Sequence, residues 1–97
     1  MTIDQFNESI TRDEPPQDLS IPLTALWWDA KGEWKRAHDL VDELETPDGI
    51  AVHAYLHRKN GEASNARYWY GKTGRDLSNL SFEAEWQAVV SQLLEAR

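Results

Sequence analysis

The sequence predicts an all-α fold of two stacked antiparallel helical hairpins closed by a C-terminal helix, and three observations support that prediction. Apolar residues recur at intervals of three and four along most of the 97 residues. No segment combines period-two alternation with the turn residues of a β-hairpin. Two similar stretches, each centred on a glycine, lie 29 residues apart (61 minus 32), as expected for a repeated helix–turn–helix unit.

The first hairpin is predicted between residues 20 and 45. Ser20 can cap a helix that runs through "IPLTALWWDAK", and Pro22 is tolerated in its first turn. Gly32 interrupts this helix, because glycine permits a tight reversal of the chain. The stretch "EWKRAHDLVDELE" then repeats apolar residues, together with His38, every three or four positions. That periodicity indicates a second amphipathic helix.

The second hairpin begins at Thr46-Pro47. Threonine is a good N-cap, and proline suits the first helical position. The helix is expected over 47–59, before Gly61. A fourth helix, "ASNARYWYGKT", is expected to stop at Gly74.

A C-terminal helix is predicted from "LSFEAEWQAVVSQLLEA", the clearest amphipathic stretch of the chain. Ser78 or Ser81 could cap its N-terminus. Stacked hairpins expose an apolar face at each end of the stack, so we expect this helix to cover one of them. Its Phe82 and Trp86 are also expected to cover aromatic surface that two short hairpins leave unburied.

Residues 1–19 differ from the domain that we assign to 20–97. The segment is acidic and contains a pair of prolines, which forces an extended connection. Its three apolar residues have helical spacing, so a short helical turn could dock onto the core: Ile3, Phe6 and Ile10. The alternative is an arm that is only partly ordered, or one that folds on binding a partner.

The composition excludes several classes of function. The chain carries 17 acidic and 10 basic residues and a net charge of −7, so binding to a nucleic-acid backbone is not expected. It has no cysteine, which excludes disulfides, thiolate metal sites and cysteine nucleophiles. No apolar stretch approaches the roughly 20 residues needed to cross a bilayer. Without a secretory signal in the sequence, the expected location is the cytoplasm.

The two glycine-centred stretches read "GEWKRA" and "GEASNA", and both place alanine five residues beyond the glycine. This pattern resembles the helical hairpin of the tetratricopeptide family. The segments "ALWWDAKGEWKRAH" and "HAYLHRKNG" also resemble a group of small bacterial proteins, a resemblance that implies no activity. The tetratricopeptide resemblance implies a concave groove lined by the outer side of the first helix of each hairpin. On this sequence those positions are Leu26, Asp29, Asp48, Ala51, Tyr55, Arg58 and Lys59.

The charge pattern supports an interaction role for that groove. Residues 58–75 contain five basic side chains against one acidic one. Tyr55, Arg58 and Lys59 would lead a small cationic face that receives an acidic peptide or another protein. We therefore predict a protein or peptide interaction module without a cofactor, whose leftover aromatic surface offers a route to a homodimer. No phosphate loop, nucleophile elbow or kinase motif appears, so an enzyme is not expected.

The histidines provide the alternative hypothesis. His53 and His57 are four residues apart on one predicted helix, within reach of a common metal ion. In stacked hairpins His38 would face the same helix, so a three-histidine site is geometrically conceivable. The competing interpretation is structural, because core histidines usually find hydrogen-bond partners. The alternative function is a small-molecule or metal-dependent protein built around these three histidines and Tyr68. Tyr68 belongs to the run "YWY", whose three rings cannot all share one helix face.

Overall fold

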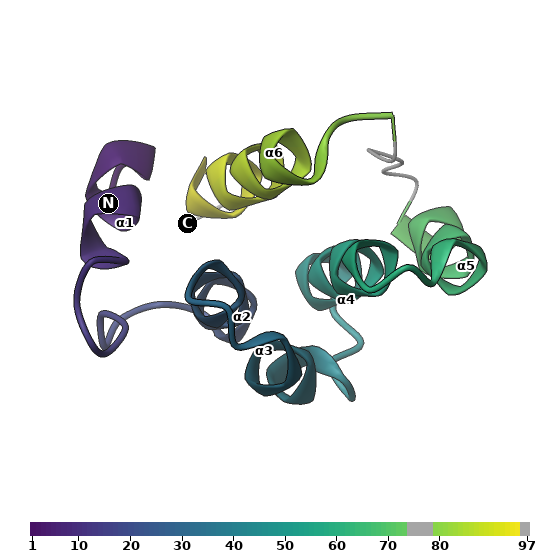
Figure 1. The fold of residues 1–97 in the computed structure, drawn as a ribbon, viewed down its shortest axis with the longest axis horizontal. Helices are drawn as coiled ribbons and strands as arrows, with labels where there is room; N and C mark the ends of the chain where they lie inside the picture. The colour runs from purple at the N-terminus through teal and green to yellow at the C-terminus, as the bar shows by residue number, and fades with distance from the viewer. Residues whose placement is uncertain (74–78, 96–97) are drawn as a thin grey trace.

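The computed structural model describes residues 1–73 and 79–95, and within them it confirms the all-α prediction. No strand occurs in these two ranges. Figure 1 shows α6 lying across α2 and α4, with α1 and α5 at opposite ends of the molecule. The helices are α1 (Ile3–Ser9), α2 (Ile21–Ala30), α3 (Trp34–Val41), α4 (Pro47–Lys59), α5 (Ala63–Thr73) and α6 (Phe82–Glu95).

The α2–α3 and α4–α5 hairpins turn through the same backbone motif. Gly32 and Gly61 have φ values of 85° and 82°, in the left-handed region that glycine adopts without strain. After each glycine a backbone N–H returns to the preceding helix, from Glu33 to the Trp28 carbonyl at 3.0 Å and from Glu62 to the His57 carbonyl at 2.9 Å. Both turns are therefore Schellman motifs, so the two stretches correspond in structure as well as in sequence.

Side-chain caps start the helices at the expected positions. The hydroxyls of Ser20 and Thr46 accept backbone N–H groups at the starts of α2 and α4, at 3.4 and 3.2 Å. Ser81 does the same for α6 at 3.1 Å, whereas Ser78 and Gly74 lie outside the described residues. The α3 helix ends at Val41, short of residue 45, because the chain must turn to reach the Thr46 cap.

The main core lies between α2, α4 and α6, and α1 closes one end of it. The ring of Phe6 is fully buried and packs on Trp86, with ring centroids 5.8 Å apart. The indole N–H of Trp27 donates to the Ser9 hydroxyl at 3.1 Å, so the N-terminal segment forms a short helix docked on the core. No helix of the described residues has the length and apolar character of a membrane span.

Candidate metal centre

The three histidines of the chain meet between α3 and α4. His38 projects from α3, and His53 and His57 project from successive turns of α4. The Nε2 atom of His53 lies 3.2 Å from Nε2 of His38 and 2.8 Å from Nε2 of His57. One ligating atom from each of the three rings falls within 4.8 Å of the other two. The structure thus brings together the three histidines that the sequence predicted to face one another.

Two tryptophans hold the rings in place. Trp34 stacks on His38, with centroids 4.9 Å apart and planes inclined by 12°. Trp69 covers His53 at 4.8 Å and 33°. Each indole N–H also has a hydrogen-bond partner: Trp34 donates to the Leu56 carbonyl at 2.9 Å, and Trp69 donates to Oδ1 of Asn65 at 2.6 Å. Because the side chains of His53, His57 and His38 are only 6, 12 and 19% exposed, the imidazoles are ordered mainly by packing.

Acidic side chains approach the cluster from two sides. Glu62 accepts a hydrogen bond from Nδ1 of His57, and this bond is the main reason why the pKa of Glu62 is lowered. Since a carboxylate can only accept, Nδ1 of His57 carries the proton, and in the neutral ring Nε2 then presents its lone pair. On the other side, Oδ1 of Asp42 lies 3.7 Å from Nε2 of His38 and 3.9 Å from Nε2 of His53.

Neither acid was predicted as part of a site, although the sequence contains a signal for each. Asp42 follows His38 by four residues and comes directly after the last residue of α3, and Glu62 follows the turn glycine of the second hairpin. The i, i+4 spacing places Asp42 on the same helix face as His38. What the sequence could not show is that α4 brings two further imidazoles to that face.

The protonation states favour binding of a cation at this point. Burial, together with the neighbouring His57 and His38, lowers the pKa of His53 to about 4, so this ring is neutral at pH 7. A neutral imidazole nitrogen offers one N–H or one lone pair, yet Nε2 of His53 faces two other Nε2 atoms. One proton cannot serve both contacts well, whereas a cation placed among the three nitrogens would be attracted by every lone pair.

The nitrogen separations also fit common ligation. At metal–nitrogen bonds of about 2.0–2.1 Å, two ligands on one ion lie about 2.9 Å apart at right angles and about 3.3–3.4 Å apart in tetrahedral geometry. The observed separations of 2.8 and 3.2 Å fall near this range. Two of the three pairs of rings are therefore spaced as ligands of a single ion would be, and the third ring nitrogen lies within 4.8 Å of the others.

Tyr68, expected as the fourth member of the cluster, lies elsewhere. Its side chain is 60% exposed, and its ring contacts Trp69 and the ammonium of Lys72 on the same helix. Successive residues of α5 point about 100° apart, so with Trp69 on His53 and Tyr70 buried, Tyr68 is left facing solvent. The residue of the "YWY" run that contacts the histidines is therefore Trp69.

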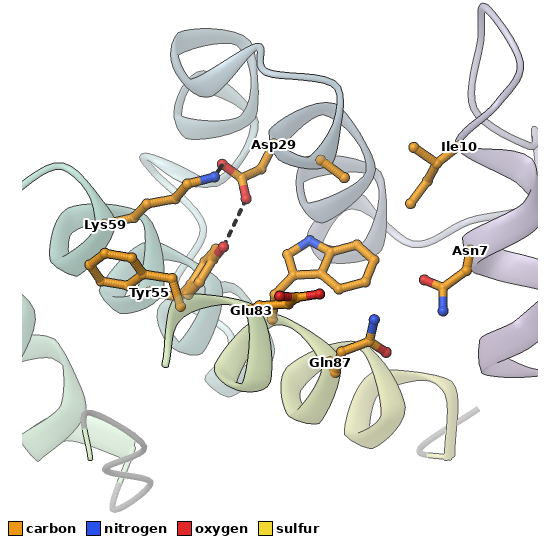
Figure 2. A pocket seen from close by; sticks show the side chains of 10 residues that line it. Asn7, Ile10, Asp29, Tyr55, Lys59, Glu83 and Gln87 are labelled. Carbon is orange, nitrogen blue, oxygen red and sulfur yellow. Dashed lines mark hydrogen bonds and ion pairs between the residues drawn. The ribbon is translucent and has the colours of Figure 1, made fainter. Parts of the chain in front are cut away.

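Tyr55 and Lys59, which were predicted to lead a cationic face, both pair with Asp29 inside the protein. Tyr55 is 2% exposed, and Figure 2 shows its hydroxyl directed at Asp29, to which it donates at 3.0 Å. The ammonium of Lys59 pairs with the other oxygen of the same carboxylate at 3.0 Å. Both residues border a cavity of about 430 Å³, which also receives Glu83 and Gln87 from α6.

Arg58, the third residue of the predicted cationic face, is also engaged. It donates to the fully buried carboxylate of Glu85 at 2.6 Å and to the carbonyl of Leu80. The Tyr70 hydroxyl donates to the same carboxylate. The physical reason for the difference from the expected groove is α6, which packs across this side of α4 and supplies Arg58 with its counter-charge.

No protein-family model matches the chain, and neither a curated protein nor a solved structure matches it. The fold and the site together define a class: a small all-α protein with three convergent imidazoles between two helical hairpins. The chemistry available to this class is that of imidazole nitrogen and carboxylate oxygen, because the chain contains no thiol.

Proposed function

We propose that the protein binds a divalent transition-metal ion through the Nε2 atoms of His38, His53 and His57. The observation that carries the proposal is the convergence of these nitrogens, at 2.8 and 3.2 Å along the cluster. Imidazole suits zinc, copper, nickel and iron, whereas magnesium and calcium prefer an all-oxygen set. A nitrogen-rich site without thiolate therefore points to zinc or a neighbouring first-row ion.

The surroundings of the rings support the same function. Histidine ligands typically donate their second ring N–H to a carboxylate or carbonyl, which orients the ring and raises its basicity. The bond from Nδ1 of His57 to Glu62 has this arrangement. Trp34 and Trp69 restrict the other two rings, so the ligands lose little conformational entropy on binding.

The interaction-module hypothesis stays a prediction, together with the tetratricopeptide resemblance that suggested it. An acidic peptide at Arg58 and Lys59 would have to displace Glu85 and Asp29, which already pair with these cations. Glu85 is fully buried and the Asp29 side chain is 1% exposed, so both displacements would expose apolar surroundings to water. We therefore prefer metal binding, which requires no such rearrangement.

Metal titration of the purified chain tests the proposal. Protein stripped with a chelator, and carrying no histidine tag, is titrated with zinc, cobalt and nickel by calorimetry. We expect one ion per chain with micromolar or tighter affinity. Since loss of an outer partner already costs about 10–100-fold in affinity, His53→Gln should weaken binding by more than a hundredfold.

The control variant is Lys35→Gln, on the exposed face of α3, where Lys35 is 85% exposed; it should bind like the wild type. All three histidines of the chain belong to the cluster. Every imidazole signal in a proton–nitrogen NMR spectrum therefore reports on the site and should shift on loading. Absence of stoichiometric binding at micromolar metal, with unmoved imidazole signals, would reject the function.

A further inference from the structure

The histidine cluster is open on one side, where a cavity of about 620 Å³ reaches His53. The cavity lies between the link from α3 to α4 and the face of α5. Its polar walls are formed by Asp42, Glu43, Glu45, His53 and Lys72. An ion held by the three imidazoles would therefore face the protein on one side and this cavity on the other.

Asp42 stands at the border between the cluster and the cavity. It caps the C-terminus of α3, and its Oδ1 atom lies 3.7 and 3.9 Å from the Nε2 atoms of His38 and His53. Within the described residues, the other acids that pair with these rings are Asp39 and Glu62, and both approach Nδ1 atoms instead. Among the described residues, Asp42 is thus the carboxylate next to the nitrogens that converge.

The distances place Asp42 just outside ligand range. Two ligands on a tetrahedral ion are separated by about 3.3–3.4 Å, roughly half an ångström less than is observed here. The Asp42 side chain is 55% exposed, and across residues 1–73 and 79–95 no shorter ion pair holds its carboxylate. A small rotation of this side chain would complete a set of three nitrogens and one oxygen.

Resting on the proposed function, we propose that Asp42 is the fourth ligand of the ion and the displaceable one. The three imidazoles are held by packing and by Glu62, whereas Asp42 is exposed and borders a cavity into which it can swing. A small molecule bearing a carboxylate has the same donor chemistry and can take its place from the cavity. The ammonium of Lys72 lies 5.6 Å from the centre of the Trp69 ring and would attract such a ligand into the cavity. The carboxylates of Glu43 and Glu45, which line the same cavity, would repel it.

Cobalt-loaded protein and acetate test this proposal on the full chain. Visible absorption of cobalt distinguishes four-coordinate from six-coordinate ions by its intensity. The wild type should show the strong four-coordinate spectrum. Asp42→Ala should lose at least about tenfold in cobalt affinity, since loss of an outer partner already costs about 10–100-fold, and its cobalt bands should shift because water takes the open fourth position. Millimolar acetate should restore the affinity and the wild-type bands in Asp42→Ala, because it supplies the missing carboxylate.

Two further variants control the experiment. Glu43→Ala removes an acid from the same cavity wall and should behave like the wild type. Asp42→Asn keeps the shape of the side chain and should lose affinity as Asp42→Ala does, which guards against a folding defect. Wild-type affinity in both Asp42 variants, without an acetate effect, would overturn the fourth-ligand proposal and leave the three-histidine function standing. Failure of the wild type to bind cobalt would instead overturn both.

Discussion

Replacing Glu62 with glutamine should weaken metal binding without disturbing the fold. Glu62 follows the turn glycine of the second hairpin and accepts the Nδ1 hydrogen of His57. This bond fixes which nitrogen of His57 carries the proton, and it directs the Nε2 lone pair at the cluster. The glutamine oxygen can still accept a hydrogen bond, but it has no charge, so His57 becomes a poorer ligand.

The size of the effect follows from the position of the carboxylate. Loss of such an outer partner costs about 10–100-fold in metal affinity. Glu62 is 42% exposed, so water screens part of its charge, and glutamine retains an acceptor. We therefore expect a loss near the lower end, about tenfold, and a larger one for Glu62→Ala.

The internal repeat supplies a matched control. Glu33 follows Gly32 as Glu62 follows Gly61, in a turn with the same backbone hydrogen bonds. Its side chain makes no cap bond, and the histidines pair with Asp39, Asp42 and Glu62 rather than with Glu33. Calorimetric zinc titration of Glu62→Gln and Glu33→Gln should show weakening in the first alone. Equal affinities in the wild type and both variants would refute the positioning role of Glu62.

Two other predictions concern the residues that the sequence assigned to a groove. Arg58→Met should lower the free energy of unfolding by about 3–5 kcal/mol, because it leaves Glu85 buried without its cation. Lys35→Met breaks only the exposed pair with Asp39 and should cost less than about 0.5 kcal/mol; similar losses in urea denaturation would contradict this. Burial, with the Asp29 carboxylate, raises the pKa of Tyr55 above its ordinary value of 10.0. In the folded protein Tyr55→Phe should therefore give the same phenolate absorbance as the wild type up to about pH 11, where an ordinary tyrosine has ionised. The raised pKa also means that the wild type loses stability relative to Tyr55→Phe as the pH rises above 10. A smaller absorbance change in the variant would count against burial of this hydroxyl.

The sequence by itself determined the helices and their turns. Caps such as Ser20 and Thr46, and the left-handed glycines 32 and 61, act within a few residues of the chain. Their effect can therefore be read without knowledge of distant neighbours. Periodicity likewise placed His53 and His57 on one face of α4, because helix geometry fixes which residues share a face.

Tertiary structure alone decided the composition of the site. Whether Tyr68 or Trp69 meets His53 depends on the rotation of α5 about its axis, which the packing of α5 against α4 sets. That Arg58 pairs inside the protein depends on α6, which arrives 27 residues later in the chain (85 minus 58). Such contacts are long-range: they follow from how whole helix faces fill space together, and no local pattern of residues encodes them.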